Sequence, residues 1–311
     1  MKQETILVTG GAGFIGSHIA EHYQGCARVR VLDNLRTGSL RNLDGLRGVE
    51  FLHGSVTDTE LVARAMEGVD YVYHLAALVS VPESMNNPGE CAAINVTGHL
   101  NVLEAAVRAG VRKLVFASSA AVYGDNPAVP KVETMPAEPR SPYAITKLDG
   151  EYYNALFTRE NRLPAVSMRF FNVFGPRQNP AGSYAAAVPI FIRNALRGAP
   201  ITIYGDGEQT RDFVYVKDIV SALVFAATTP GLSGEFNIGY GAATSINALA
   251  RKITALSGSH STLEYRPVRT GDVRHSVAGT DKIRAAGWTP LYDLDEGLRA
   301  TVAHFNEVWA R

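Results

Sequence analysis

Three glycines near the N-terminus restrict the fold of this chain more than any other feature. Gly10, Gly13 and Gly16 follow the apolar run 5–8 and open a stretch, 14–23, whose pattern predicts a helix. A glycine triplet alone is weak evidence, since the chain has 29 glycines. Between a buried strand and a helix, however, glycine permits a tight turn and lets the backbone approach a pyrophosphate at the helix N-terminus. The sequence therefore predicts a dinucleotide site at this turn.

An acidic residue at the end of the second predicted strand supports this interpretation. Asp33 follows the apolar run 29–32 and lies 17 residues after Gly16. A carboxylate at this place accepts a hydrogen bond from a ribose hydroxyl and repels a 2′-phosphate, which favours NAD over NADP. Arg36, three residues further on, tempers that preference.

Short apolar runs alternate with helical stretches through the first half of the chain. Further strands are expected at 49–52, 71–75, 113–117 and 165–170, and helices at 61–66, 92–109 and 144–159. This alternation predicts an α/β protein with a doubly wound parallel sheet of the Rossmann type.

The alternation of predicted strands and helices becomes less regular after about residue 175. A helix at 186–196 and a strand at 202–204 are expected there, and 235–238 is expected to rejoin the main sheet. We therefore predict an NAD-binding domain of residues 1–174, rejoined by about 213–240. A smaller, partly interleaved α/β substrate domain would comprise 175–212 and 241–311.

Composition excludes several classes of protein. Thirty basic residues balance thirty acidic ones, so no net charge attracts nucleic acid or an anionic membrane surface. Two cysteines are too few for a disulfide framework or a four-ligand zinc site, and the histidines lack metal-ligand spacing. No run approaches the ~20 apolar residues of a membrane span, and the N-terminus lacks the apolar core of a signal peptide. We expect a cytoplasmic protein with no metal site.

A tyrosine and a lysine four residues apart form the second motif. Of thirteen tyrosines, only Tyr143 is followed at this spacing by a lysine, Lys147. Positions i and i+4 share a helix face, so the phenol and the ammonium can meet at one substrate. The ammonium and an oxidised nicotinamide would favour the phenolate; lowering its pKa from ~10 to ~7 requires about 4 kcal/mol. An isolated pair of this kind is usually a surface feature, but downstream of the glycine turn we interpret it as catalytic.

Ser119 completes the candidate catalytic set. It follows the run 113–117, at the carboxyl edge of the predicted sheet, where α/β proteins bind their ligands. Its hydroxyl is placed to hydrogen-bond a reacting hydroxyl and orient it. Without the Tyr-Lys pair, the same serine would be interpreted as a cap at the end of a strand.

With these three elements the chain resembles the extended short-chain dehydrogenase/reductase family, and within it the nucleotide-sugar 4-epimerases. The resemblance covers nearly the whole length. It is carried by 74–77, Asn95, 119–124, Tyr143 with Lys147, 169–175, 205–207 with 211–213, and 269–272.

The resemblance implies the reaction. NAD would stay bound through turnover, and Tyr143 would take the proton of the sugar 4-hydroxyl while C4 gives a hydride to NAD⁺. The 4-keto sugar would rotate, and the hydride would return to its other face. Similar 4,6-dehydratases carry an Asp-Glu pair directly after the catalytic hydroxyl residue, where this chain has Ala120 and Ala121. Elimination would lack proton carriers there, so we disfavour it.

The resemblance also implies which residues hold NAD. One departs from the family pattern: Ser55 stands where an Asp usually contacts the adenine amino group, and serine is the weaker acceptor. Asp58 is a candidate substitute, and full retention of NAD is left open. The implied cofactor residues are Gly10, Gly13, Phe14, Ile15, Gly16, Asp33, Asn34, Arg36, Thr37, Gly38, Ser55, Val56, Leu75, Ala76, Ala77, Asn95, Tyr143, Lys147 and Phe171.

A UDP-sugar is the implied substrate. Asn172, Arg211 and Arg269 would hold the diphosphate, since guanidinium groups suit phosphate oxygens. Tyr204 would lie near the uracil and Ser80 beside the sugar. The other implied substrate residues are Ser119, Tyr143, Ala187, Val188, Asp272 and Ser276.

Ser276 bears on the size of the sugar. In the family, a large tyrosine at this position excludes an N-acetyl group at C2, and here the residue is small. We expect UDP-N-acetylglucosamine and UDP-N-acetylgalactosamine to be accepted, with UDP-glucose and UDP-galactose alongside, because a small gate does not reject a small substrate.

Two alternatives stay open at this stage. One is another NAD-dependent UDP-sugar oxidoreductase or decarboxylase; the other is a non-catalytic NAD-binding regulator, which the retained Tyr-Lys pair disfavours. The resemblance further implies a homodimer formed through helices at 95–109 and 144–159.

Overall fold

The computed structural model describes residues 3–180, 186–268 and 273–309, and its chain divides into two compact units. The first comprises Met1–Gly124, Pro136–Phe170 and Val220–Phe236; the second comprises Asp125–Met135, Phe171–Ile219 and Asn237–Arg311. The boundaries of these units differ from the predicted domains at 125–135, 171–174, 213–219 and 237–240, which the prediction includes in the NAD-binding domain and which belong to the second unit. The assignment of NAD to one domain and substrate to the other remains a prediction.

A seven-stranded sheet forms the centre of the first unit, in the order β11-β6-β5-β4-β1-β2-β3. The neighbouring strands from β6 to β3 run parallel, which confirms the predicted Rossmann-type sheet. The strand order reverses direction between β1 and β4, and this is the place where such sheets bind ligands. The strands are β1 (Thr5–Thr9), β2 (Arg28–Asp33), β3 (Val49–His53), β4 (Tyr71–His74), β5 (Lys113–Ser119), β6 (Ala165–Phe170) and β11 (Gly234–Ile238).

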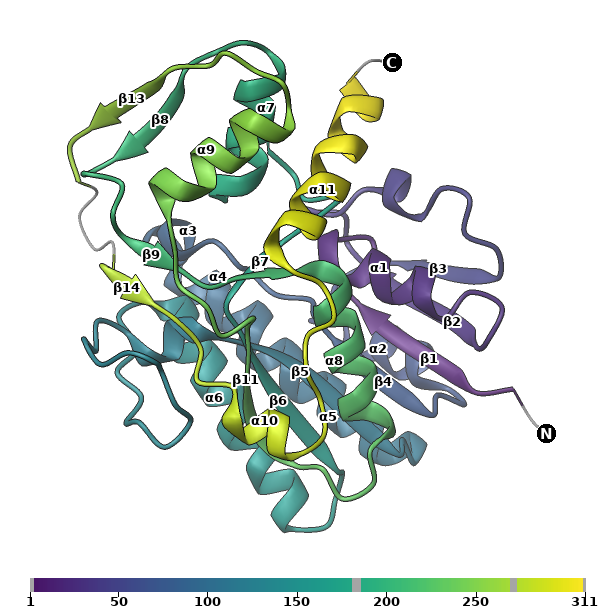
Figure 1. The fold of residues 1–311 in the computed structure, drawn as a ribbon. Coiled ribbons are helices and arrows are strands. Elements are labelled where there is room, and N and C mark those ends of the chain that lie inside the picture. The colour runs from purple at the N-terminus through teal and green to yellow at the C-terminus, as the bar shows by residue number, and fades with distance from the viewer. Residues whose placement is uncertain (1–2, 181–185, 269–272, 310–311) are drawn as a thin grey trace. The chain divides into compact units, whose positions relative to one another are not determined.

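Helices cover both faces of this sheet. Leu61, Val102 and Phe157, from α2, α5 and α6, pack with Leu7 and Val72 in one apolar core. Figure 1 shows α1 and α8 on the other face. These helices are α1 (Phe14–His22), α2 (Thr59–Met66), α5 (Gly98–Ala109), α6 (Pro142–Arg159) and α8 (Val216–Thr228).

Two predicted helices begin earlier than expected. The helix predicted from residue 144 begins at Pro142, because the hydroxyl of Ser141 caps it by accepting from the Ala144 amide at 3.2 Å. Tyr143 therefore lies in its first turn. The helix predicted at 92–109 is preceded by α4 (Pro88–Ala92) and joined to α5 by a π-helical turn, Ala93–Thr97. Short elements complete this unit: η1 (Leu40–Leu43), α3 (Val81–Asn86) and η3 (Ala120–Tyr123).

Short strands and the helices α7, α9, α10 and α11 form the described part of the second unit. β10 pairs parallel with β7, β9 pairs with β12 and β14, and β13 pairs parallel with β8. Figure 1 shows β8 and β13 side by side, next to α7 and α9. The elements are β7 (Asn172–Phe174), α7 (Ala187–Leu196), β8 (Ile201–Tyr204), β9 (Thr210–Arg211), β10 (Phe213–Tyr215), β12 (Thr244–Ser245), α9 (Ile246–Leu256), β13 (Leu263–Arg266), β14 (His275–Ser276), α10 (Asp281–Ala285) and α11 (Leu294–Trp309).

The described residues contain neither a membrane-spanning helix nor a cluster of metal ligands. Among them, no helix has both the length and the apolar content to cross a bilayer. They also contain no group of three or more His, Cys, Asp or Glu side chains arranged to hold a metal ion.

Candidate active site

The glycine turn joins β1 to α1 where the backbone leaves no room for side chains. Gly10 has a φ of +70°, and a Cβ on it would lie 2.8 Å from the amide nitrogen of Ala76. A Cβ on Gly16 would collide with the carbonyl of Gly10. Gly13 caps α1 without a side-chain hydrogen bond, and the first turn of α1, which includes Phe14 and Ile15, holds no acid. The amides of this helix end, and its partial positive charge, therefore suit a pyrophosphate, so the turn fits NAD.

Asp33 lies beside this turn at the end of β2. Its carboxylate accepts hydrogen bonds from the amide of Ala12 at 3.0 Å and from the amide of Leu35 at 2.7 Å. The loop that follows, with Asn34, Arg36, Thr37 and Gly38, closes against the turn, where the Ser39 amide donates to the Ala12 carbonyl at 3.0 Å. The predicted ribose acid and the predicted pyrophosphate turn are thus in direct contact.

The serine that departs from the family pattern has local partners. Ser55 lies after β3, beside the buried Val56, and its hydroxyl accepts from the amide and the hydroxyl of Thr57 at 3.2 and 2.8 Å. Asp58 caps α2 by accepting from the Leu61 amide at 3.0 Å. The Ser55 hydroxyl thus already accepts two hydrogen bonds, whereas Asp58 uses one carboxylate oxygen to cap α2. Which of the two would accept from an adenine amino group stays a prediction.

The segment after β4 is tied to the end of β1 and to the helix behind it. The amides of Leu75 and Ala76 donate to the carbonyl and the hydroxyl of Thr9 at 3.1 and 3.2 Å. Asn95, in the π-helical turn, bonds to both backbone groups of Leu78, at 2.7 and 3.0 Å. These bonds fix the course of 75–78, which includes Ala77, beside the glycine turn.

Ser80 ends that segment by capping α3. Its hydroxyl accepts from the amide of Glu83 at 3.2 Å. The serine predicted to lie beside the sugar is therefore also a helix cap, and it stays partly exposed.

The three predicted catalytic residues come together. Ser119 is the last residue of β5, and its hydroxyl is hydrogen-bonded to the phenol of Tyr143. Lys147, one turn along α6, places its Nζ 5.9 Å from the centroid of the Tyr143 ring. The same Nζ donates to the carbonyl of Ala117 at 2.7 Å, which holds the ammonium against the end of β5. The fold thus assembles a serine, a phenol and an amine at the carboxyl edge of the sheet.

Burial is the largest influence on the pKa values of Tyr143 and Lys147 in the structure, which contains no ligand. It raises the pKa of Tyr143, and the hydrogen bond from Ser119 opposes that effect. Burial also lowers the pKa of Lys147 to about 8, partly offset by Cys91 and Glu151. The expected fall in the phenol pKa is therefore not a property of the chain alone, because desolvation outweighs the hydrogen bond from Ser119.

A buried ion pair behind this set was not predicted from the sequence. Glu151 lies one helical turn after Lys147, and its carboxylate binds the guanidinium of Arg169 and the hydroxyl of Ser118. Arg169 also donates to the phenol of Tyr123 at 2.9 Å. The i+4 spacing was the available signal, but it does not show that a glutamate is buried.

The second unit contains a cavity of about 490 Å³, which is the size of a small-molecule site. Five predicted substrate residues line it: Asn172, Ala187, Val188, Tyr204 and Arg211. The fold therefore collects them around one space, although they come from four different elements.

The remaining predicted substrate residues lie elsewhere or outside the described residues. Ser276 pairs with Arg211 in the register of β14 and β9, so the predicted gate is next to a cavity-lining strand. Arg269 and Asp272 fall outside the residues that the structure describes. Phe171, predicted to contact NAD, lies in the second unit, where its amide donates to the Ile238 carbonyl at 3.1 Å.

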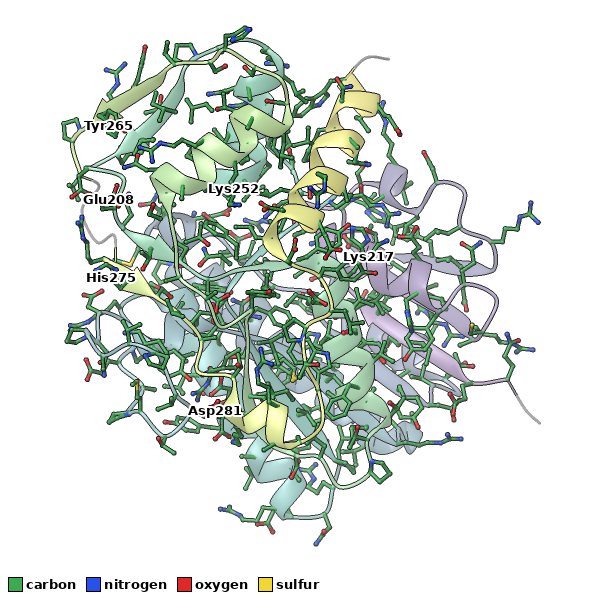
Figure 2. All side chains as sticks on the ribbon, viewed as in Figure 1. Glu208, Lys217, Lys252, Tyr265, His275 and Asp281 are labelled. Atoms are coloured by element: carbon green, nitrogen blue, oxygen red, sulfur yellow. The ribbon has the colours of Figure 1, made fainter. Side chains whose placement is uncertain are left out.

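Gln209 lines the same cavity and had not been predicted. Its Nε2 donates to the Tyr204 carbonyl at 2.7 Å, while its buried Oε1 has no hydrogen-bond partner within the described chain. Asn247 braces the neighbouring turn, donating to Glu208 at 2.6 Å and accepting from Tyr265 at 3.0 Å. Figure 2 labels Glu208 and Tyr265. A residue of the cavity wall therefore carries a buried acceptor without a partner in the described chain, for which no local sequence pattern exists.

This geometry defines a class: a Rossmann-type protein with a serine, tyrosine and lysine at the coenzyme edge is a short-chain dehydrogenase/reductase of the extended kind. The NAD dependent epimerase/dehydratase family matches residues 6–239. The chain belongs to that family.

Individual relatives match over almost the whole length. The UDP-glucose 4-epimerase of Mycolicibacterium smegmatis is 39% identical, over 96% of this chain and 97% of its own. The solved UDP-N-acetylglucosamine 4-epimerase of Methanobrevibacter ruminantium, in complex with UDP-N-acetylmuramic acid, is 37% identical, with a TM-score of 0.95 over 99% of this chain and 100% of its own. The UDP-glucose 4-epimerase of Thermus thermophilus, in complex with NAD, is 40% identical, with a TM-score of 0.88 over 97% and 99% of the two chains.

Proposed function

We propose that this chain is a UDP-sugar 4-epimerase that uses NAD. One observation carries the proposal: Tyr143 is hydrogen-bonded to Ser119 and shares a helix with the buried Lys147, in a chain that matches 4-epimerases from end to end. The residues that would hold NAD are the glycine turn 10–16, Asp33 and the segment 75–77. NAD, when bound, supplies a reversible acceptor for the hydride on C4 of the sugar.

The chain's own residues manage the proton. Tyr143 takes the proton of the sugar 4-hydroxyl and later returns it, and Ser119 donates a hydrogen bond that orients the reacting oxygen. The Lys147 ammonium, held at the Ala117 carbonyl, favours the ionised phenol. Each role needs only small movements, because the three side chains already meet at the edge of the sheet.

The chain lacks the proton carriers of a dehydratase at the places next to Ser119. Ala120 and Ala121 form the start of the turn η3. A methyl group neither donates nor accepts a proton, so elimination of water from the sugar has no support there. Epimerisation needs no second acid or base, and it is therefore the favoured reaction.

The cavity of the second unit is the proposed uridine diphosphate site. Arg211 and Asn172 would bind phosphate oxygens, and Tyr204 and Gln209 would face the uracil. Ser276, opposite Arg211 in the strand register, leaves room beside the sugar. We accordingly propose that the enzyme accepts UDP-N-acetylglucosamine and UDP-N-acetylgalactosamine as well as UDP-glucose and UDP-galactose.

One assay tests the proposal. The purified protein is incubated with each of the four UDP-hexoses without added cofactor, and the products are separated by chromatography. Interconversion of the C4 epimers, with no net absorbance at the NADH band, supports it. Absence of product from all four contradicts it, and carbon dioxide release or accumulating NADH would indicate the alternative decarboxylase or oxidoreductase.

We further propose a cytoplasmic homodimer formed through α6 and α5. The apolar side chains of Ile145, Tyr152 and Leu156 on α6 are exposed in the isolated chain. Such a face on a helix favours burial against a second copy. Light scattering after gel filtration would give twice the mass of the chain, and Ile145→Lys with Tyr152→Lys would give monomer; a monomeric wild-type protein contradicts this proposal.

A further inference from the structure

The guanidinium of Arg36 is held by two carboxylates from other elements. Its Nη1 lies 2.5 Å from Oε1 of Glu90, and its Nη2 lies 2.7 Å from Oε1 of Glu83 and 3.1 Å from Oε2 of Glu90. Glu83 belongs to α3 and Glu90 to α4. Two carboxylates thus converge on one guanidinium.

Arg36 occupies the loop that follows the proposed ribose acid. It is three residues beyond Asp33, whose carboxylate contacts the glycine turn at Ala12. In dinucleotide-binding sheets, an acid at this place accepts from the ribose hydroxyl of NAD, whereas a nearby arginine accommodates the 2′-phosphate of NADP. This chain contains both residues, so its coenzyme preference depends on whether Arg36 is available.

The charges around Arg36 oppose a phosphate. Asp33, Glu83 and Glu90 contribute three negative charges against the single positive charge of Arg36. A 2′-phosphate would compete with two charge-assisted hydrogen-bond acceptors for the guanidinium and would leave their carboxylates unpaired beside it. The ribose of NAD, which lacks that phosphate, meets neither penalty.

We propose that Glu83 and Glu90 determine coenzyme specificity, by binding Arg36 and so keeping it from the 2′-phosphate of NADP. The inference rests on the proposed function for the location of the coenzyme, and it adds two residues that belong to α3 and α4 and not to the glycine turn. It predicts that a chain with the NAD-type acid intact gains affinity for NADP when these two carboxylates are neutralised.

The test measures binding rather than turnover. The double variant Glu83→Gln/Glu90→Gln keeps the shapes of the side chains and removes two negative charges. Protein freed of co-purified nucleotide is titrated with NAD⁺ and with NADP⁺ in a calorimeter. We expect the ratio of the dissociation constants, NADP⁺ over NAD⁺, to fall at least tenfold relative to the wild type. A smaller fall overturns the inference.

Two further variants separate release of Arg36 from a general change of charge. Adding Arg36→Gln to the double variant should restore at least most of the wild-type ratio; if the gain persists, Arg36 is not responsible. Glu4→Gln/Glu50→Gln removes two carboxylates from other surface pairs, with Arg112 and Arg30, and should leave the ratio unchanged. If the wild type binds neither nucleotide, the proposed function fails as well, whereas binding of NAD⁺ with an unmoved ratio defeats only this inference.

Discussion

Arg169 and Glu151 form a two-point ion pair in the interior of the first unit, with Nε to Oε1 at 2.9 Å and Nη2 to Oε2 at 2.7 Å. Their side chains are 7% and 6% exposed, so water does little to screen either charge. Ser118 and Tyr123 complete the hydrogen bonds of the pair. The pair therefore couples β6, β5 and α6 directly behind the candidate catalytic residues.

Removing one partner of this pair should destabilise the fold. Arg169→Met leaves the Glu151 carboxylate buried without its counter-charge, and we expect the free energy of unfolding to fall by about 3–5 kcal/mol. The double variant Arg169→Met/Glu151→Met should lose much less than the sum of the two single variants. Urea unfolding followed by circular dichroism measures both. Arg162→Met, which breaks the exposed pair with Glu104, serves as the control and should cost about 1 kcal/mol or less; equal losses at the two sites would contradict the argument.

The sequence did not predict this ion pair, because it depends on contacts between residues that are far apart in the chain. The strands at 5–8, 29–32 and 165–170 were predicted because an apolar run is a local signal, and β1, β2 and β6 confirm them. Tyr143 and Lys147 were found because their spacing lies on one helix. Glu151 has the same spacing from Lys147, but its burial depends on Arg169, which another strand supplies.

The second unit was less predictable for the same reason. Its strands β9, β12 and β14 have two residues each, and they pair across more than thirty residues of sequence. Strands this short have no hydrophobic periodicity from which they could be predicted. Gln209 is a candidate only through its tertiary surroundings, because it lines the cavity and its buried oxygen lacks a partner in the described chain. Such contacts are set by tertiary packing rather than by local pattern.

Replacing the candidate base should slow turnover without preventing binding. Tyr143→Phe removes the only atom that would exchange the proton, and we expect kcat to fall about 100- to 10,000-fold. Interconversion of the UDP-hexoses measures the rate, and calorimetry with UDP measures binding. Tyr152→Phe, an exposed tyrosine on the same helix, should keep near-normal kcat. A Tyr143→Phe enzyme as fast as that control would reject the assignment.

Acid should destabilise the fold through a buried imidazole. His99 stacks on His74 and contacts the ring of Phe116 at a tilt, and burial lowers its pKa from 6.5 to about 3. Between these pH values the unfolded chain binds a proton that the folded chain does not, so stability is lost as the pH falls below about 6.5.

The dependence of the free energy of unfolding on pH tests this role of His99. This one group lowers the free energy of unfolding by up to roughly 1.4 kcal/mol for each pH unit of acidification, a slope that is nearly complete below about pH 5.5. His99→Gln should therefore lose less stability than the wild type between pH 6.5 and 4, as measured by urea unfolding at each pH. His260→Gln, at an exposed position, is the control and should follow the wild type; parallel curves for all three proteins would contradict the prediction.

The unused oxygen of Gln209 should contribute to nucleotide binding. Gln209→Leu removes the acceptor from the cavity wall, and we expect the affinity for UDP to fall about 5- to 10-fold, which corresponds to one neutral hydrogen bond. Gln178→Leu is a matched control, because Gln178 also donates to a backbone carbonyl and has a buried, unpartnered oxygen within the described residues, yet it does not line the cavity. Calorimetric titration with UDP compares them, and equal losses in the two variants would show that Gln209 acts only through the fold.

The size of residue 276 should set which sugars fit. Ser276 stands opposite Arg211 in the strand register, beside the strand that lines the proposed diphosphate site. A tyrosine there adds a ring without altering the backbone pairing, so Ser276→Tyr should lower kcat/KM for UDP-N-acetylglucosamine at least tenfold while changing that for UDP-glucose less than threefold. The ratio of the two constants is the measurement, since a general loss of folding would lower both together. Ser276→Ala keeps the position small and should leave the ratio as it is. A tyrosine variant that still turns over both sugars in the wild-type ratio would show that the N-acetyl group lies elsewhere.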